Sequence, residues 1–145
     1  LEAGLPLYGH ELDETTTPVE AGLGWSIPKR RREAGDFPGA ETILAQLRDG
    51  PPRRLVALRP EGRAPAREGA EIRYDESRVG VVTSGGFAPS LDGPAALGYV
   101  CESIADGAQV ALIVRGRALP ATVSKPPLVP HRYKRADRSA QRSDA

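Results

Sequence analysis

Between residues 53 and 124 the sequence consists of short apolar segments, each ended within a few residues by glycine or proline. The 16 glycines and 14 prolines make up about a fifth of the 145 residues, so turns are favoured over long helices. Six short strands at this spacing predict a small antiparallel barrel or sandwich. The predicted strands are 54–59, 71–74, 78–83, 95–100, 109–115 and 118–124, with a long loop over 84–94.

The first 52 residues carry a looser pattern. Residues 1–28 are rich in glycine and predict loops, with a short strand at 23–27. The basic run Lys29-Arg30-Arg31-Arg32 predicts a loop that leads into a helix. Asp36 can accept a hydrogen bond from the first turn of that helix, and Pro38 can occupy the turn because its missing N–H is harmless there.

Apolar residues at helical spacing continue this helix until Gly50 ends it. One helix followed by several strands gives an α+β fold class. The last ten residues, 136–145, contain no large apolar side chain and are predicted to be a disordered tail.

Charge and composition exclude several function classes. Twenty basic and 19 acidic residues leave a net charge of +1, which does not favour nucleic acid as a partner. One cysteine and two histidines predict no disulfide and no metal site. The longest apolar run, 110–114, is too short to cross a membrane. The sequence has no methionine and begins with Leu1, so we expect an upstream part.

A few residues could carry chemistry. The carboxylate of Glu2 could accept two parallel hydrogen bonds from a guanidinium or from the N–H and NH₂ edge of a pterin, or it could be a solvated side chain. The arginines after Lys29 could bind a carboxylate or phosphate, or they could form a solvated basic loop. The run 83–87 is interpreted as a turn, Cys101 as a small buried side chain, and His131 as a surface histidine. A small-molecule site and a non-catalytic packing module both remain open.

Eight groups of short motifs lie in one order along residues 1 to about 135. They include Leu1-Glu2-Ala3-Gly4-Leu5 with Leu7-Tyr8-Gly9, Thr17-Pro18-Val19-Glu20, Lys29-Arg30-Arg31-Arg32 with Asp36-Phe37-Pro38-Gly39-Ala40, Gly80-Val81-Val82-Thr83-Ser84-Gly85, Pro89-Ser90-Leu91, Ala96-Leu97-Gly98-Tyr99-Val100, and Ser124-Lys125-Pro126-Pro127. In order and spacing they resemble the C-terminal portion of the aminomethyltransferase (T-protein) of the glycine cleavage system.

The resemblance implies a division of the chain. Residues 1–28 would be the end of a folate-binding α+β core, and residues 29–52 a connecting basic loop and helix. Residues 53–135 would form the C-terminal β-barrel domain. By the same resemblance Glu2 binds the pterin ring of tetrahydrofolate, Arg31 contacts its glutamate tail, and Tyr133 lies at the same site.

The family reaction passes an aminomethyl group from the lipoyl arm of the H-protein to tetrahydrofolate, and releases ammonia and 5,10-methylenetetrahydrofolate. The family's catalytic aspartate would lie upstream of Leu1, so no catalytic residue is assigned here, and this chain alone is expected to be inactive. The alternatives are a folate-binding domain of a sarcosine- or dimethylglycine-oxidising enzyme, or a non-catalytic folate-binding module. The expected compartment is the cytoplasm of a bacterium, or the mitochondrial matrix if the source is eukaryotic.

Overall fold

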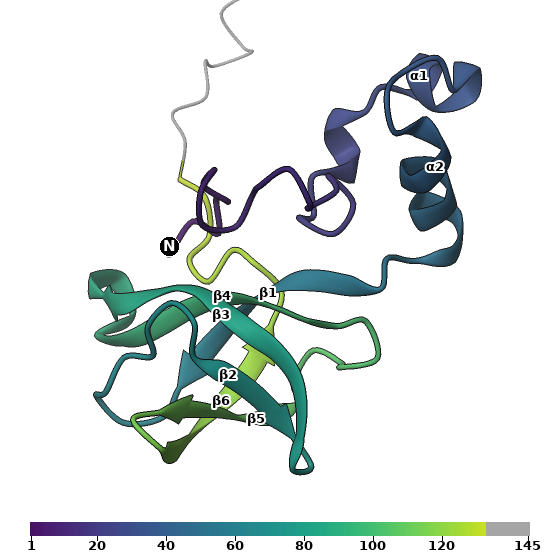
Figure 1. Ribbon diagram of the computed structural model, residues 1–145. Coiled ribbons are helices and arrows are strands. Elements are labelled where there is room, and N and C mark those ends of the chain that lie inside the picture. Colours follow the sequence, from purple (N-terminus) through teal and green to yellow (C-terminus); the bar gives the residue numbers. More distant parts are fainter. Residues whose placement is uncertain (133–145) are drawn as a thin grey trace, which may run out of the picture.

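The computed structural model describes residues 1–132 and consists of a β-barrel with a loop-rich helical segment on top of it (Figure 1). The barrel is closed, all its neighbouring strands are antiparallel, and their order is β1-β4-β3-β2-β5-β6. The small antiparallel barrel expected from the sequence is therefore confirmed. Its strands are β1 Arg53–Pro60, β2 Glu71–Tyr74, β3 Ser77–Ala88, β4 Gly93–Cys101, β5 Gln109–Val114 and β6 Arg117–Ser124.

Apolar side chains from all six strands fill the barrel. The largest fully buried ones inside the barrel are Leu58, Ile72 and Leu112. A second buried cluster of Leu55, Ala57, Leu97 and Tyr99, with Leu128 against it, joins strands β1 and β4. Strand β1 is buried at four successive positions because its two faces are both covered, by the barrel interior and by other parts of the chain.

The middle of the barrel differs from the sequence prediction. The expected loop over 84–94 is wrong, because β3 continues to Ala88 and pairs with β4 down to Gly93. The interpretation of 83–87 as a turn fails for the same reason. A register shift between Val82 and Ser84 allows the strand to continue. Glycine is required inside this strand because a Cβ at Gly85 would overlap the carbonyl oxygen of Ala66.

The helical segment also contains corrections. The strand predicted at 23–27 is instead a 3-10 turn, η1 Gly24–Ser26. The basic run is not a loop but belongs to a short helix, α1 Lys29–Ala34. The following helix, α2 Ala40–Asp49, begins three residues later than predicted, because its N-cap is Gly39, in the left-handed conformation at φ +76°, and not Asp36.

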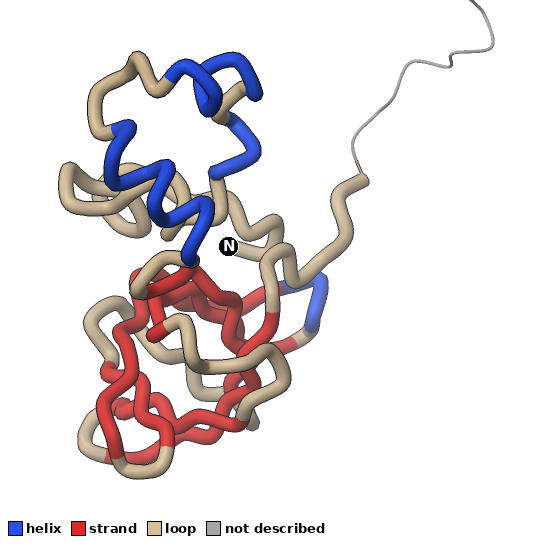
Figure 2. Tube along the Cα trace, turned by 90° about the vertical axis from the view of Figure 1, so that its right-hand side faces the viewer, coloured by secondary structure: helices blue, strands red, loops and turns tan. Residues whose placement is uncertain are grey.

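Two further predictions concern single residues and the C-terminus. Cys101 is exposed, so its interpretation as a buried side chain is wrong. It lies at the last position of β4, where the strand leaves the barrel. Tyr133 and the predicted tail at 136–145 lie outside the described residues. Figure 2 shows most of the helical residues on one side of the strands, with the N-terminus between the two parts and one short helical turn beside the strands.

Candidate functional site

The barrel holds Glu2 from two directions. The backbone N–H of Ser90 donates to one carboxylate oxygen at 2.7 Å, and the Ser90 hydroxyl donates to the other at 2.8 Å. The backbone carbonyl of Glu2 accepts from the N–H groups of Leu128 and Val129, both at 3.1 Å. Ser90 lies in the short 3-10 turn η2 Pro89–Leu91 between β3 and β4, so both the backbone and the carboxylate of Glu2 are fixed.

Gly4 allows this close approach. Its φ is +62°, and a Cβ there would lie 2.5 Å from the Cβ of Pro126. A side chain at position 4 would therefore push the N-terminal residues away from the segment that follows β6. Residues 1–4 form a turn, which is closed by a hydrogen bond from the Gly4 N–H to the carbonyl of Leu1. Glycine at this position thus brings Glu2 to the barrel.

Arg31 lies elsewhere, in helix α1, and is half-buried. Its Nη1 donates to the Asp36 carboxylate at 2.7 Å. Arg31 and Asp36 line a cavity of about 460 Å³ whose other walls are mostly apolar side chains, such as Phe37 and Ile43. Glu2 is not part of this cavity, so the structure does not bring the two predicted folate ligands into one pocket. In Figure 1 the N-terminus lies just above the barrel, whereas α1 lies at the far end of the helical segment.

The neighbouring arginines behave differently from one another. Arg32 donates from Nε to the carbonyl of Ile27 at 2.7 Å and from Nη2 to that of Gly24 at 2.8 Å, so it ties α1 to η1. Arg30 is exposed, and its side chain makes no hydrogen bond or ion pair within the part of the chain that the structure describes. Arg32 is therefore structural, and Arg30 is a matched control for Arg31.

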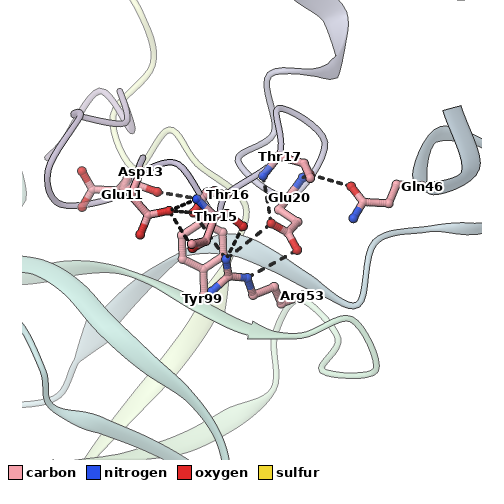
Figure 3. A network of polar contacts seen from close by, with 9 residues as sticks. All are labelled: Glu11, Asp13, Thr15, Thr16, Thr17, Glu20, Gln46, Arg53 and Tyr99. Atoms are coloured by element: carbon pink, nitrogen blue, oxygen red, sulfur yellow. Dashed lines mark hydrogen bonds and ion pairs between the residues drawn. The ribbon is translucent and has the colours of Figure 1, made fainter. Parts of the chain in front are cut away.

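A network of polar side chains fastens the loop-rich segment to the barrel (Figure 3). Arg53, the first residue of β1, approaches the Glu20 carboxylate at 3.4 Å and lies over the Tyr99 ring at 4.8 Å from its centroid. Glu20 is 5% exposed, so Arg53 offsets part of the cost of burying its carboxylate. Next to it, Thr17 hydrogen-bonds Gln46 of α2, which links the helix to the same network.

Glu11 forms the other half of this network. It is 3% exposed, and its carboxylate accepts from the Leu7 N–H at 3.0 Å and from the Thr83 hydroxyl at 2.8 Å. Its carbonyl accepts from the Tyr99 hydroxyl at 2.9 Å. Burial raises the pKa of Tyr99 well above its usual range, which keeps this hydroxyl protonated as a donor. Hydrogen bonds from Thr15 and Thr16 hold the pKa of Asp13 below its usual value.

Replacing Arg53 should weaken the attachment of the segment to the barrel. Arg53→Ala leaves Glu20 buried without its cation and removes the contact with the Tyr99 ring. We expect the free energy of unfolding to fall by about 2 to 3 kcal/mol, measured by urea denaturation. Arg48→Ala is the control, because Arg48 pairs with Asp49 at the surface and should change stability by less than about 1 kcal/mol. Equal losses for the two variants would contradict the role of the network.

Sequence reasoning missed Ser90, Glu11, Glu20 and Arg53. One signal was present: Thr17-Pro18-Val19-Glu20 has the spacing of a capping box with proline at the first helical position. The structure shows that pattern, with the Thr17 N–H donating to Glu20 and the Glu20 N–H donating to Thr17. No comparable local signal exists for Ser90, because its partner is 88 positions away.

Two features are absent from the described residues. Residues 1–132 contain no group of three or more His, Cys, Asp or Glu side chains arranged to hold a metal ion. None of the helices in the same range has the length and apolar character needed to cross a membrane.

The fold first defines a class: a small closed antiparallel barrel with a preceding segment fastened to its outer surface. Residues 53–130 match the family model of the glycine cleavage T-protein C-terminal barrel domain. The chain therefore belongs to the glycine cleavage T-protein family, and the resemblance inferred from its motifs is confirmed.

Relatives extend the match beyond the barrel. The chain is 47% identical over 135 residues to the mitochondrial aminomethyltransferase of Mesembryanthemum crystallinum, which covers 92% of this chain and 33% of the relative. It is 48% identical over the same length to the mitochondrial aminomethyltransferase of Homo sapiens. The crystal structure of the glycine cleavage system aminomethyltransferase T from Bartonella henselae superposes with a TM-score of 0.86 at 44% identity, covering 92% of this chain and 38% of that one. The chain spans about a third of the length of the curated relatives it matches.

Proposed function

We propose that the chain is the C-terminal part of a tetrahydrofolate-dependent aminomethyltransferase. The complete enzyme takes the aminomethyl group from the lipoyl arm of the H-protein and passes it to tetrahydrofolate. Ammonia, 5,10-methylenetetrahydrofolate and the reduced lipoyl carrier are the products. Identity of 44% to 48% with aminomethyltransferases over nearly the whole chain favours this function over a domain of a sarcosine- or dimethylglycine-oxidising enzyme.

The held carboxylate of Glu2 is the observation that carries the folate assignment. A carboxylate has about four acceptor positions, two on each oxygen. Ser90 uses one on each oxygen, which leaves one on each for a ligand. A fixed pair of acceptors suits a partner with two parallel donors, such as the N–H and NH₂ edge of a pterin ring.

Arg31 supplies the complementary charge for the other end of the ligand. Folate is elongated, with a pterin at one end and glutamate carboxylates at the other, so its two ends require separate protein groups. The pair with Asp36 occupies Nη1 of Arg31. The remaining N–H groups of the guanidinium can pair with a carboxylate of the tail. Tyr133 remains a proposed third contact, outside the described residues.

Replacing Arg31 should weaken the binding of folate at its tail. In the complete enzyme, Arg31→Ala is expected to raise the dissociation constant of tetrahydrofolate by roughly 5- to 10-fold, because a half-exposed charge pair is lost. Arg30→Ala should change it by less than about 2-fold, since Arg30 has no partner among the described residues. Fluorescence titration compares the two variants, and an equal loss for both would count against a specific role for Arg31.

The activity itself is tested by product release. The complete enzyme, mixed with aminomethyl-loaded H-protein and tetrahydrofolate, should release ammonia and form 5,10-methylenetetrahydrofolate in equal amounts. Without tetrahydrofolate the release of ammonia should be much slower. Folate-independent turnover at the full rate would refute the proposed function.

The chain alone is proposed to be inactive, because the carboxylate that the family uses to drive ammonia loss matches no residue of this sequence. We assign residues 1–28 to the end of the folate-binding core, 29–52 to the connection and 53–135 to the barrel domain. The compartment would be the cytoplasm in a bacterium. The relatives from Mesembryanthemum crystallinum and Homo sapiens are mitochondrial, which favours the matrix for a eukaryotic source.

A further inference from the structure

We propose that Ser90 is a positioning residue of the folate site: its backbone N–H and its hydroxyl fix the plane of the Glu2 carboxylate so that the two free acceptor positions face the pterin. This inference rests on the proposed function, because it assigns a role to Ser90 only through Glu2. It gives the barrel a part in folate binding that is exerted through Glu2.

The geometry separates Ser90 from an ordinary surface contact. One residue donates to both oxygens, at 2.7 and 2.8 Å, so the carboxylate cannot turn about its last bond without losing one donor. The backbone of the same residue, Glu2, is tied to the segment that follows β6. With the backbone held on one side and the carboxylate on the other, the side chain between them has little freedom left.

The position of Ser90 in the barrel explains how a short turn can hold the Glu2 carboxylate in one orientation. Strand β3 ends at Ala88, and the single 3-10 turn η2 brings the chain back into β4 at Gly93. The turn is closed by a hydrogen bond from the Asp92 N–H to the Pro89 carbonyl. The N–H of Ser90 points out of this turn towards Glu2. Ser90 is therefore held by the two strands on either side of its turn, and it supports Glu2 more rigidly than a residue in a flexible loop would.

The test is a double-mutant cycle in the complete enzyme, with tetrahydrofolate as the probe. Ser90→Ala keeps the backbone donor and removes the hydroxyl. We expect the dissociation constant to rise about 5- to 10-fold, and KM for tetrahydrofolate to rise with kcat nearly unchanged. Ser90→Thr restores the hydroxyl and should return affinity to within about 2-fold of the wild type. Ser77→Ala, at the exposed opposite end of β3, is the control and should have no effect.

Combining Ser90→Ala with Glu2→Ala distinguishes the positioning role of Ser90 from the proposed binding of folate by Glu2. If Ser90 acts through Glu2, Ser90→Ala should cause no further loss once Glu2 is alanine. An unchanged affinity in Ser90→Ala, or an equal loss with and without Glu2, overturns the positioning role while Glu2→Ala alone still tests the folate site. Wild-type affinity in Glu2→Ala would instead overturn the proposed folate ligand, and the role of Ser90 with it.

Discussion

Gly80→Ala is expected to lower the free energy of unfolding of this chain by about 3 kcal/mol. Gly80 lies in β3 and pairs with both β2 and β4, opposite Ile72 and Val100. A Cβ there would overlap the carbonyl oxygen of Tyr99. Because that oxygen belongs to the backbone of β4, which is paired with β1 and β3, the strain cannot be relieved by turning a side chain. The measurement is the midpoint of urea denaturation followed by circular dichroism.

Gly86→Ala is the matched control in the same strand. A Cβ at Gly86 would meet only Leu1 at 3.9 Å and Arg67 at 4.0 Å, which are ordinary contacts. The change should therefore leave stability within about 1 kcal/mol of the wild type. A similar loss in both variants would show that strand propensity, and not the close approach of β3 to β4, accounts for the effect.

Glu2→Ala is expected to raise KM for tetrahydrofolate about 100-fold or more in the complete enzyme. The variant loses both hydrogen bonds from the pterin N–H and NH₂ edge to the charged Glu2 carboxylate, and each is worth about 1.5 to 3 kcal/mol. Glu2→Gln should also weaken the binding of tetrahydrofolate, because the amide nitrogen is a hydrogen-bond donor and would face a donor of the pterin. It is expected to cost about 10-fold or more.

Glu14→Ala controls for the loss of a negative charge near the N-terminus. Glu14 is exposed and should leave KM within about 2-fold of the wild type. Thermal unfolding of all three variants checks that they fold. If Glu14→Ala raised KM as much as Glu2→Ala, the effect would come from the net charge and the proposed ligand would be wrong.

The barrel could be predicted because its signals are local. Each strand carries its own short apolar run. The turn between β5 and β6 depends on two adjacent residues, Arg115 and Gly116, which both have positive φ. The barrel prediction failed over residues 84–94, where glycine has two possible roles. Gly85 and Gly86 were interpreted as a turn, whereas they continue β3 next to β4, since glycine also permits backbones to approach.

The candidate site was predictable only in part. The carboxylate chemistry of Glu2 and the resemblance pointed to a ligand, but its partner Ser90 is distant in sequence and belongs to the barrel. The ion pair of the buried Glu20 with the half-exposed Arg53 could not be predicted either, because a charge in a polar loop is usually solvated and only the folded barrel covers Glu20. Long-range partners of this kind are set by tertiary structure and leave no periodic pattern.

The most direct measurement is a calorimetric titration of tetrahydrofolate into the complete enzyme and into its Glu2→Ala variant. If Glu2 binds the pterin ring, the variant should bind at least about 100-fold more weakly, with a smaller enthalpy of binding because hydrogen bonds to a charged acceptor are lost. Equal dissociation constants for the wild type and the variant would contradict the account.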